Sequence, residues 1–133
     1  MKLEGKAIIV TGSGTGIGKA IAKLCIQEGA NVVISDKNEK LAEETVDELG
    51  PDQAIAHIQD LTDEGCAAEL IRLAKERFGS VDGLVNNAAF VTWSDIESTN
   101  PDYFRKVLDV NLVAPLSLIP VSYTHLTLPT SYP

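Results

Sequence analysis

The fold of this chain is decided by the stretch TGSGTGIG at residues 11–18. It follows a short run of β-branched and small apolar residues at positions 7–10 and precedes apolar residues spaced three and four apart, so it predicts a turn from a strand into a helix. Missing side chains let the backbone approach an anion closely, and the free N–H groups at a helix start favour negative charge. The turn therefore indicates a phosphate-binding site, although glycines alone are also typical of a flexible turn or a methyltransferase loop.

Strand and helix patterns alternate along the rest of the sequence. The predicted strands are residues 7–10, 32–35, 54–58 and 81–85. The first helix is expected to bury one apolar face, made of Ile17, Ala20, Ile21, Leu24 and Cys25. Strands joined by helical crossovers run parallel, because each crossover returns the chain to the same end of the sheet. The sequence therefore predicts a doubly wound parallel α/β fold.

Capping residues predict where the later helices begin and end. Asn38 is expected to cap the second helix and Gly50 to end it. Thr62 is expected to cap the third helix. Asn100 followed by Pro101 predicts the start of the last helix, because proline is favoured at the first helical position.

The composition limits what the chain can bind. Its 133 residues suit one domain, and 11 Lys and Arg against 19 Asp and Glu give a formal charge of −8, which disfavours nucleic acid and anionic membranes as partners. No apolar run is long enough to span a membrane, and the first six residues lack the apolar stretch of a signal peptide, so a cytoplasmic location is expected. Cys25 and Cys66 have no pairing motif and no histidine at ligand spacing, so we expect two buried thiols and no metal site.

An acidic residue ends the second predicted strand. Asp36 lies eighteen residues beyond Gly18, where a carboxylate can accept hydrogen bonds from both hydroxyls of an adenosine ribose. The same charge repels a 2′-phosphate, so the pattern favours NAD over NADP. The alternative interpretation is that Asp36 is a solvated turn residue before Lys37.

These motifs resemble those of the short-chain dehydrogenase/reductase family. The turn matches the family's TGxxxGxG pattern, and residues 60 and 61 resemble its adenine-contacting pair. Residues 86–89 (NNAA) resemble its NNAG element, with Ala89 in place of the glycine, and residues 109–112 (DVNL) resemble its DxNL segment. The resemblance covers residues 1 to about 119 and implies a Rossmann-type doubly wound parallel sheet, truncated after about four strands.

The motifs and the resemblance together imply a set of site residues. Those expected to bind the cofactor are Gly12, Ser13, Thr15, Gly16, Ile17, Gly18, Asp36, Asp60, Leu61, Asn87, Ala88, Ala89 and Val110. Asn111 is implied as catalytic, because the corresponding carbonyl of the family holds a water in a proton relay. Pro115 supports this role, since it has no N–H to bond the carbonyl four residues earlier. A packed asparagine beside an incidental proline is the alternative.

The resemblance also implies an activity for the parent enzyme. It is expected to move a hydride between NAD(H) and a small secondary alcohol or ketone, and to form a homodimer or homotetramer. A non-catalytic nucleotide-binding sensor or pseudoenzyme on the same scaffold remains the alternative. A methyltransferase is a more distant one, because it leaves the NNAA and DVNL segments unexplained.

The end of the sequence departs from the family. The family's active site needs a tyrosine, a lysine four residues later and an upstream serine, but Tyr123 is followed at that distance by Thr127, and neither lysine nor arginine occurs after Lys106. Residues 121–130 (VSYTHLTLPT) resemble a translated transposase sequencing adapter. We therefore expect a native domain at residues 1–119, a non-native tail at residues 120–133, and no catalysis by the chain as it stands.

Overall fold

The computed structural model describes residues 1–123, and its centre is a four-stranded parallel sheet. The strand order is β3-β2-β1-β4, and the strands are β1 (Ala7–Thr11), β2 (Asn31–Asp36), β3 (Ala54–Ile58) and β4 (Gly83–Val85). β4 begins two residues later than residue 81, where the sequence placed it. The predicted Rossmann-type parallel sheet is confirmed, and all four strands end at one edge.

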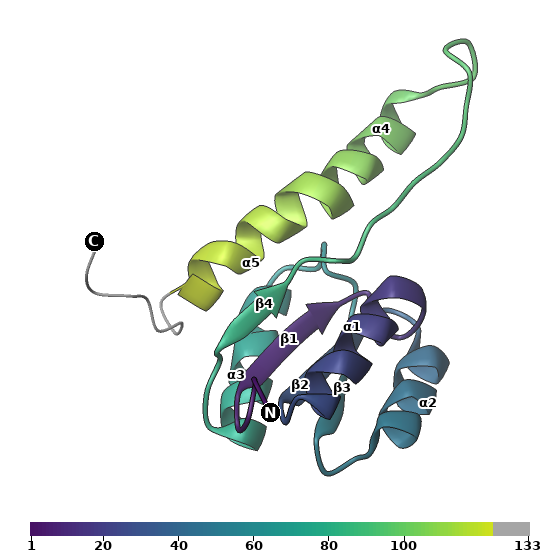
Figure 1. Ribbon diagram of the computed structural model, residues 1–133. Coiled ribbons are helices and arrows are strands. Elements are labelled where there is room, and N and C mark those ends of the chain that lie inside the picture. Colours follow the sequence, from purple (N-terminus) through teal and green to yellow (C-terminus); the bar gives the residue numbers. More distant parts are fainter. Residues whose placement is uncertain (124–133) are drawn as a thin grey trace, which may run out of the picture.

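Helices cover both faces of this sheet (Figure 1). Helices α1 (Gly16–Gln27) and α2 (Glu39–Leu49) pack on one face, and α3 (Cys66–Phe78) and α5 (Ala114–Tyr123) pack on the other. The buried residues on the α1 and α2 side are Ile8, Val10, Ala22, Ala30, Val32, Ile34, Ala42 and Ala54. Those on the α3 and α5 side are Ile9, Val33, Cys66, Leu70, Ile71, Ala74, Val81 and Leu118. Neighbouring residues of β1 and β2 thus serve opposite cores, which explains the unbroken apolar runs at residues 7–10 and 32–34.

The last helical segment forms a rod that extends beyond the sheet (Figure 1). It consists of α4 (Pro101–Leu108), the π-helix η1 (Asp109–Val113) and α5. The Asn100 side chain accepts a hydrogen bond from the Tyr103 N–H at 3.0 Å, which confirms the predicted cap. In η1 the Ala114 N–H bonds the Asp109 carbonyl five residues earlier. The wider π turn precedes Pro115, whose ring interrupts regular helical bonding.

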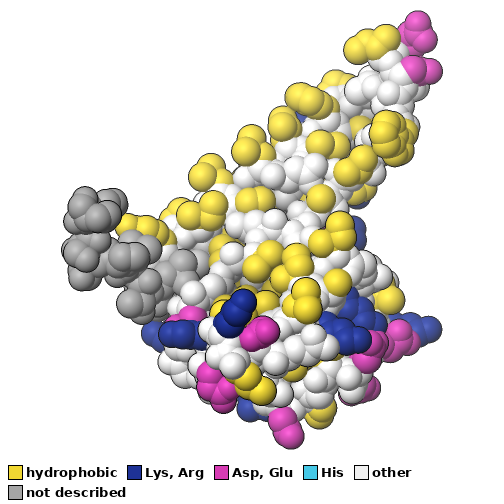
Figure 2. Space-filling model, viewed as in Figure 1, with side chains coloured by type: hydrophobic (Ala, Val, Ile, Leu, Met, Phe, Trp, Pro, Cys, Tyr) yellow, Lys and Arg dark blue, Asp and Glu magenta, His cyan; other side chains and the backbone are white. Residues whose placement is uncertain are grey.

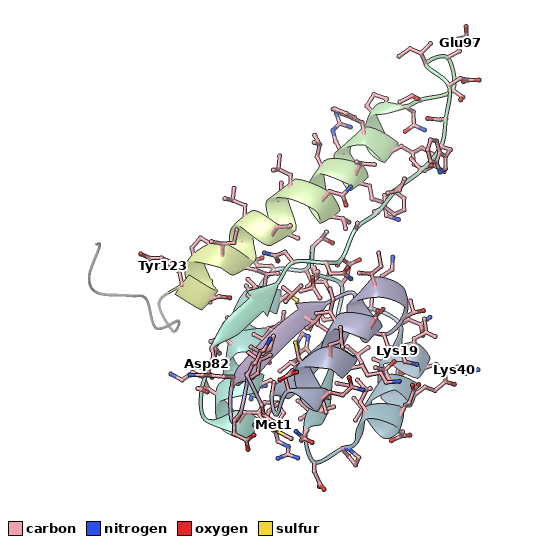
Figure 3. All side chains as sticks on the ribbon, in the orientation of Figure 1. Met1, Lys19, Lys40, Asp82, Glu97 and Tyr123 are labelled. Atoms are coloured by element: carbon pink, nitrogen blue, oxygen red, sulfur yellow. The ribbon has the colours of Figure 1, made fainter. Side chains whose placement is uncertain are left out.

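One carboxylate joins the start of β1 to the segment that leads into β4. Asp82, labelled in Figure 3, accepts hydrogen bonds from the Ala7 N–H at 2.8 Å and from the Ser80 hydroxyl at 2.7 Å, and so ties the start of β1 to the approach to β4. Partial burial raises the pKa of Asp82, but the two hydrogen bonds and the positive charge of Lys6 together outweigh it, so the net pKa lies below its usual value. Residues 86–100 then lead from β4 to the far end of the rod, where Glu97 lies well away from the sheet (Figure 3).

The inward face of α1 differs from the predicted one. Ile17 and Leu24 are 75% and 62% exposed, and Ala20 is also exposed. Gly18 and Ala22 are buried instead, and Ile21, Cys25 and Ile26 pack against the core. The cause is Gly18, which approaches the end of β1 so closely that it must face inward, and at 100° per residue this rotates the line through residues 17, 20 and 24 outward.

The predicted cap of the third helix was also wrong. Thr62 donates both its N–H (2.9 Å) and its hydroxyl (2.7 Å) to Asp60, so it belongs to a turn that follows β3. Helix α3 begins later, at Cys66, and its N-cap residue is Gly65. The cap of α2 is confirmed, since the Asn38 side chain accepts the Leu41 N–H at 3.0 Å.

The predicted non-native tail lies partly within the described chain. Residues 120–123 continue helix α5, where Ser122 is buried and Val121 packs against the core on the α3 side. Residues 124–133 lie outside the described residues. Within residues 1–123 no helix combines the length and the apolar character that a membrane span requires.

Candidate functional site

A cleft of about 390 Å³ lies at the edge where the strands end. It is lined by Gly12, Thr15, Ile17, Ser35, Asp36, Lys37, Gln59, Asp60, Leu61, Asn87, Ala88, Ala89, Phe90, Lys106 and Val110. Ten of the thirteen residues predicted to bind a cofactor therefore share one cleft, and Ser13, Gly16 and Gly18 are the three outside its lining. This location is typical of ligand sites in doubly wound sheets.

The sequence analysis did not predict five of the lining residues. Ser35, Lys37, Gln59 and Phe90 each adjoin a predicted residue in the sequence, so the rule that strand ends carry the site would have found them. Lys106 lies on α4, four residues before Val110. That spacing puts Lys106 and Val110 on one face of a helix. It was the only feature of the sequence that could have predicted Lys106 as a cleft residue.

Thr11 and Asn87 tie the ends of β1 and β4 together beneath the cleft. The Thr11 hydroxyl accepts the N–H groups of Asn87 at 3.1 Å and Ala88 at 3.0 Å. The Asn87 side-chain amide donates to the carbonyls of Thr11 at 3.0 Å and Gly12 at 3.2 Å. Because Thr11 is buried, these bonds are shielded from water and fix the chain after β4 against the glycine turn.

The glycines of the turn have different surroundings. A Cβ on Gly18 would lie 2.4 Å from the Gly12 carbonyl oxygen, so this position excludes any side chain. Gly12 has φ of +64° and would place a Cβ 2.8 Å from the Ala88 Cα. Gly16 has φ of +60°, but a Cβ there would meet nothing within 4 Å. The space over Gly16 is therefore open, next to the first N–H groups of α1.

Ser13 is one of the predicted residues outside the cleft lining, and its side chain bonds within the protein. It is fully buried, and its hydroxyl donates to the Val10 carbonyl at 2.7 Å and accepts the Ser35 N–H at 3.1 Å. The hydroxyl thus replaces a missing backbone partner between β1 and β2 at the point where the turn leaves the sheet. Ser13 supports the turn from below.

Asp36 is held by two backbone donors. Its Oδ2 accepts the Gly14 N–H at 3.0 Å, and its Oδ1 accepts the Asn38 N–H at 3.0 Å. Each carboxylate oxygen keeps a second lone pair, so the group still accepts bonds from a ligand. A Cβ on Gly14 would lie 2.8 Å from the same carboxylate, which shows how closely the turn approaches it.

Asp60 supplies a second carboxylate to the cleft. Hydrogen bonds from the backbone and hydroxyl of Thr62, together with the positive charges of Lys37 and Lys106, hold the pKa of Asp60 below its usual value, although partial burial raises it. Asp60 therefore carries a negative charge at neutral pH. The cleft lining combines two carboxylates, Asp36 and Asp60, with two ammonium groups.

Asn111 lies outside the cleft lining, and its side chain fastens the rod to the chain after β4. Its Oδ1 accepts the Phe90 N–H at 2.7 Å, and its Nδ2 donates to the Phe90 carbonyl at 2.8 Å. Its backbone carbonyl receives no bond from Pro115, which has no N–H. Ala89, which replaces the family glycine, carries no backbone strain, because no residue other than glycine has positive φ within residues 1–123.

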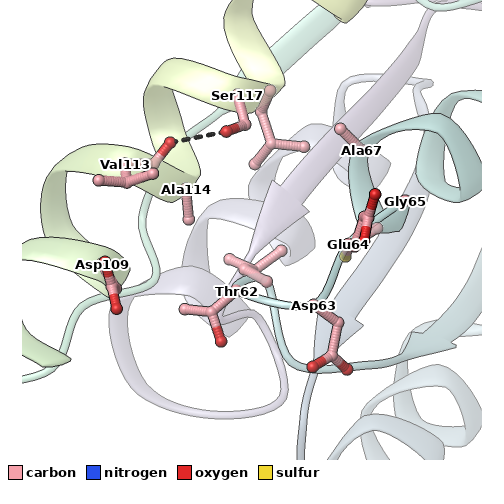
Figure 4. A pocket seen from close by; sticks show the side chains of 12 residues that line it. Thr62, Asp63, Glu64, Gly65, Ala67, Asp109, Val113, Ala114 and Ser117 are labelled. Carbon is pink, nitrogen blue, oxygen red and sulfur yellow. Dashed lines mark hydrogen bonds between the residues drawn. The ribbon is translucent and has the colours of Figure 1, made fainter.

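A second cleft of about 340 Å³ separates the start of α3 from η1 and α5 (Figure 4). Its polar lining includes Asp63, Glu64 and Asp109. Cys66 also lines it, but burial raises the pKa of this thiol to about 11, with a smaller contribution from Asp63 and Asp60. The thiol is therefore protonated and unreactive at neutral pH, as expected for a small buried side chain.

Comparison with known proteins places this geometry in a family. The family model described as short chain dehydrogenase matches residues 6–128, so the chain belongs to that family. Its glycine turn and parallel sheet are those of a Rossmann-type fold.

Individual relatives agree with this assignment. The chain is 37% identical to a sorbitol dehydrogenase of Cereibacter sphaeroides, over 90% of this chain and 46% of the relative. It is 38% identical to an NADP-dependent (R)-specific alcohol dehydrogenase of Lentilactobacillus kefiri, over 84% of this chain and 44% of the relative. A crystal structure of 3-ketoacyl-(acyl-carrier-protein) reductase from Brucella melitensis complexed with NADH superimposes with a TM-score of 0.87 and 34% identity, over 92% of this chain and 51% of that one. The chain thus spans about half the length of the relatives it matches.

Proposed function

We propose that this chain is the NAD(H)-binding half of an oxidoreductase that transfers a hydride between nicotinamide and a small secondary alcohol or ketone. The observation that carries the proposal is the cleft in which an open glycine turn faces a fixed carboxylate, Asp36, from the neighbouring strand. Turn and carboxylate suit a pyrophosphate and a ribose that are covalently linked.

Along the edge of the sheet, the residues around the cleft suit successive parts of a nicotinamide dinucleotide. The open space over Gly16 and the first N–H groups of α1 suit the pyrophosphate, and Asp36 suits the adenosine ribose. Asp60, Leu61 and Val110 provide polar and apolar surface for the adenine beyond that ribose. When bound, the dinucleotide supplies or accepts the hydride at its nicotinamide ring.

We further propose that the site prefers NAD(H) to NADP(H). A 2′-phosphate on the adenosine ribose would stand beside the Asp36 carboxylate, and like charges at such contacts cost several kcal/mol. Lys37 also lines the cleft and offsets part of this repulsion. A preference of roughly a hundredfold is the expected net effect.

Asn111 is the residue of this half that we assign to the proton relay. Pro115 has no N–H to bond the Asn111 backbone carbonyl, and this carbonyl is the group that we propose holds a water of the relay. The partners of that relay, a tyrosine and a lysine four residues later, do not occur in this sequence. We therefore expect residues 1–133 to bind the cofactor and to show no turnover of ketones with NADH.

Titration calorimetry of the chain with NADH, ADP-ribose and NADPH tests the binding proposal. NADH and ADP-ribose are expected to bind, and NADPH to bind about a hundredfold more weakly. Equal Kd values for NADH and NADPH would contradict the NAD preference alone. Failure of the folded chain to bind either dinucleotide or ADP-ribose would contradict the proposed function itself.

We propose that the parent enzyme is a homo-oligomer that associates through the rod. Apolar side chains cover the outer surface of the rod (Figure 2), and the exposed fractions of Phe104, Leu112 and Leu116 are 59%, 60% and 63%. Contiguous exposed apolar surface of this kind is typical of protein interfaces. Sedimentation of the Leu112→Glu, Leu116→Glu double variant tests it, and unchanged association would contradict it.

We also propose that the native domain ends at residue 119 and that residues 120–133 derive from a sequencing adapter. The resemblance of residues 121–130 to the translated adapter supports this boundary. Resequencing the source DNA across residue 119 tests it. A genuine reading frame that encodes VSYTHLTLPT would contradict the proposal.

A further inference from the structure

Phe90, Lys106 and Val110 form one wall of the cleft, and Phe90 provides its aromatic ring. The Lys106 ammonium nitrogen lies 4.3 Å from the centre of the Phe90 ring, within the range of a cation–π contact. Both residues line the cleft, and so does Val110, which follows Lys106 by one helical turn on the rod. The wall therefore combines a ring from the chain after β4 with two side chains of the rod.

The backbone of Phe90 is fixed on both sides. Its N–H and its carbonyl are both bonded to the Asn111 side chain, at 2.7 Å and 2.8 Å. With the backbone held by Asn111 and the ring held by Lys106, little conformational entropy is left to lose when a ligand packs against the ring. A half-buried aromatic ring, preorganised in this way in a cleft that also carries charged groups, is suited to stack on a flat heteroaromatic group.

The arrangement of the strands indicates which group that is. The pyrophosphate position is at the end of β1, Asp36 ends β2, and Asp60 follows β3, so the base of a dinucleotide extends from Asp36 toward Asp60. Lys106 lies at that end of the cleft, because the rod runs beside the segment that follows β3: Leu61 and Asp109 line the second cleft together, and Lys106 and Val110 line the first cleft with Asp60. Phe90 follows β4 in the chain, but its contact with Lys106 turns the ring toward the rod.

We propose that Phe90 stacks on the purine base of the bound dinucleotide and that Lys106 is a positioning residue that holds the Phe90 ring for this contact. The inference rests on the proposed function, since it assumes that a dinucleotide binds in the cleft. It adds a determinant of base recognition to the polar pair at residues 60 and 61. Stacking tolerates any purine, so the wall contributes affinity for the base rather than discrimination between adenine and other purines.

The test combines calorimetry with NMR on the chain of residues 1–133. The Phe90→Ala substitution is expected to raise the Kd of ADP-ribose roughly tenfold, while Phe90→Tyr keeps it near the wild-type value. Lys106→Met is expected to raise the Kd of ADP-ribose about two- to fivefold. Lys106→Arg should keep this Kd near the wild-type value, because arginine keeps a cation over the ring. Arg105→Met is the matched control, since Arg105 precedes Lys106 on α4, pairs with Asp102 and does not line the cleft.

An NMR measurement on the wild-type chain tests the contact between the Phe90 ring and the purine base directly. Nuclear Overhauser effects are expected between the Phe90 ring protons and the adenine H2 or H8 proton of bound ADP-ribose. The proposal is overturned if those effects are absent, if bound NAD shows them only from its nicotinamide ring, or if folded Phe90→Ala binds ADP-ribose with wild-type affinity. If the wild-type chain binds neither ADP-ribose nor NADH, the proposed function fails, and the stacking role fails with it. Weak binding by Phe90→Ala alone leaves the proposed function intact, because that function concerns wild-type binding.

Discussion

The same small substitution at two neighbouring glycines is expected to have opposite effects. Gly16→Ala should leave the chain folded and impair dinucleotide binding, whereas Gly18→Ala should destabilise the fold itself. Both changes add one methyl group to the first turn of α1. The two positions differ in what the methyl group meets and in backbone conformation, since only Gly16 has a positive φ.

At Gly18 the methyl group meets fixed backbone. It would lie 2.4 Å from the Gly12 carbonyl oxygen and 2.6 Å from the Asn87 side-chain nitrogen, and since ordinary C···O contacts begin near ~3.3 Å, about 0.9 Å of space must be opened. Neither neighbour moves easily, because the same Asn87 nitrogen donates to the carbonyls of Thr11 and Gly12. Overpacking and the loss of one of those bonds together cost about 2–4 kcal/mol. That is a large fraction of the ~5–15 kcal/mol by which small domains are stable.

At Gly16 the methyl group meets open space. The cost to the fold is the strain of an alanine at φ of +60°, about 1 kcal/mol. The methyl group occupies the space proposed for the pyrophosphate, so NADH affinity should fall at least about tenfold, which is ~1.4 kcal/mol.

Urea unfolding and NADH titration of both variants separate the two effects. The expected result is a loss in the free energy of unfolding that is at least about 1 kcal/mol larger for Gly18→Ala than for Gly16→Ala. Equal losses would refute the close-packing argument for Gly18. Wild-type NADH affinity in Gly16→Ala would refute the placement of the phosphates over the turn.

Three further changes test the electrostatics of the chain. Asp36→Ser should reduce the preference for NADH over NADPH by about tenfold or more, measured as the ratio of the two Kd values, and an unchanged ratio would count against the ribose position. The pKa of Asp82 is lowered in the folded chain, so its carboxylate stabilises the fold above about pH 4 and loses that contribution as the pH falls through the folded pKa. Asp82→Asn should thus lower Tm at pH 7, by an amount that corresponds to about 1 kcal/mol in the free energy of unfolding. The Tm of the variant should fall less on acidification than the wild-type Tm, and parallel curves of Tm against pH would exclude this role. Burial lowers the pKa of His57 against an opposing effect of Glu69, so stability is fully present above about pH 6.5 and declines below it. His57→Leu should flatten the Tm profile between about pH 7.5 and 5, and a profile that keeps the wild-type slope would contradict this role.

The sheet was predictable because its determinants are local. Both faces of β1 and β2 are buried, so their centres appear in the sequence as the apolar runs 7–10 and 32–34. The caps at Asn38 and Asn100 bond N–H groups only three residues away. The rotation of α1 was not predictable from periodicity. It is set by the approach of Gly18 to Gly12 and Asn87, and the last of these is distant in the sequence. The burial of the Ser13 side chain was not predictable for the same reason, since its partner Ser35 is on another strand.

The glycine motif therefore combines two kinds of constraint that the sequence does not separate. Gly12 and Gly18 lack side chains because the protein itself fills the space: a Cβ at either would come within 2.8 Å of another protein atom. Gly16 has no such neighbour, so packing within the chain does not explain its glycine, and its positive φ alone is a modest requirement that other turns meet with asparagine. Under the proposed function, a side chain at Gly16 would obstruct the pyrophosphate of the bound dinucleotide. Agreement with the motif at Gly12 and Gly18 is thus evidence about the fold, whereas the open position at Gly16, beside a carboxylate fixed at Asp36, is the part of the motif that bears on the ligand.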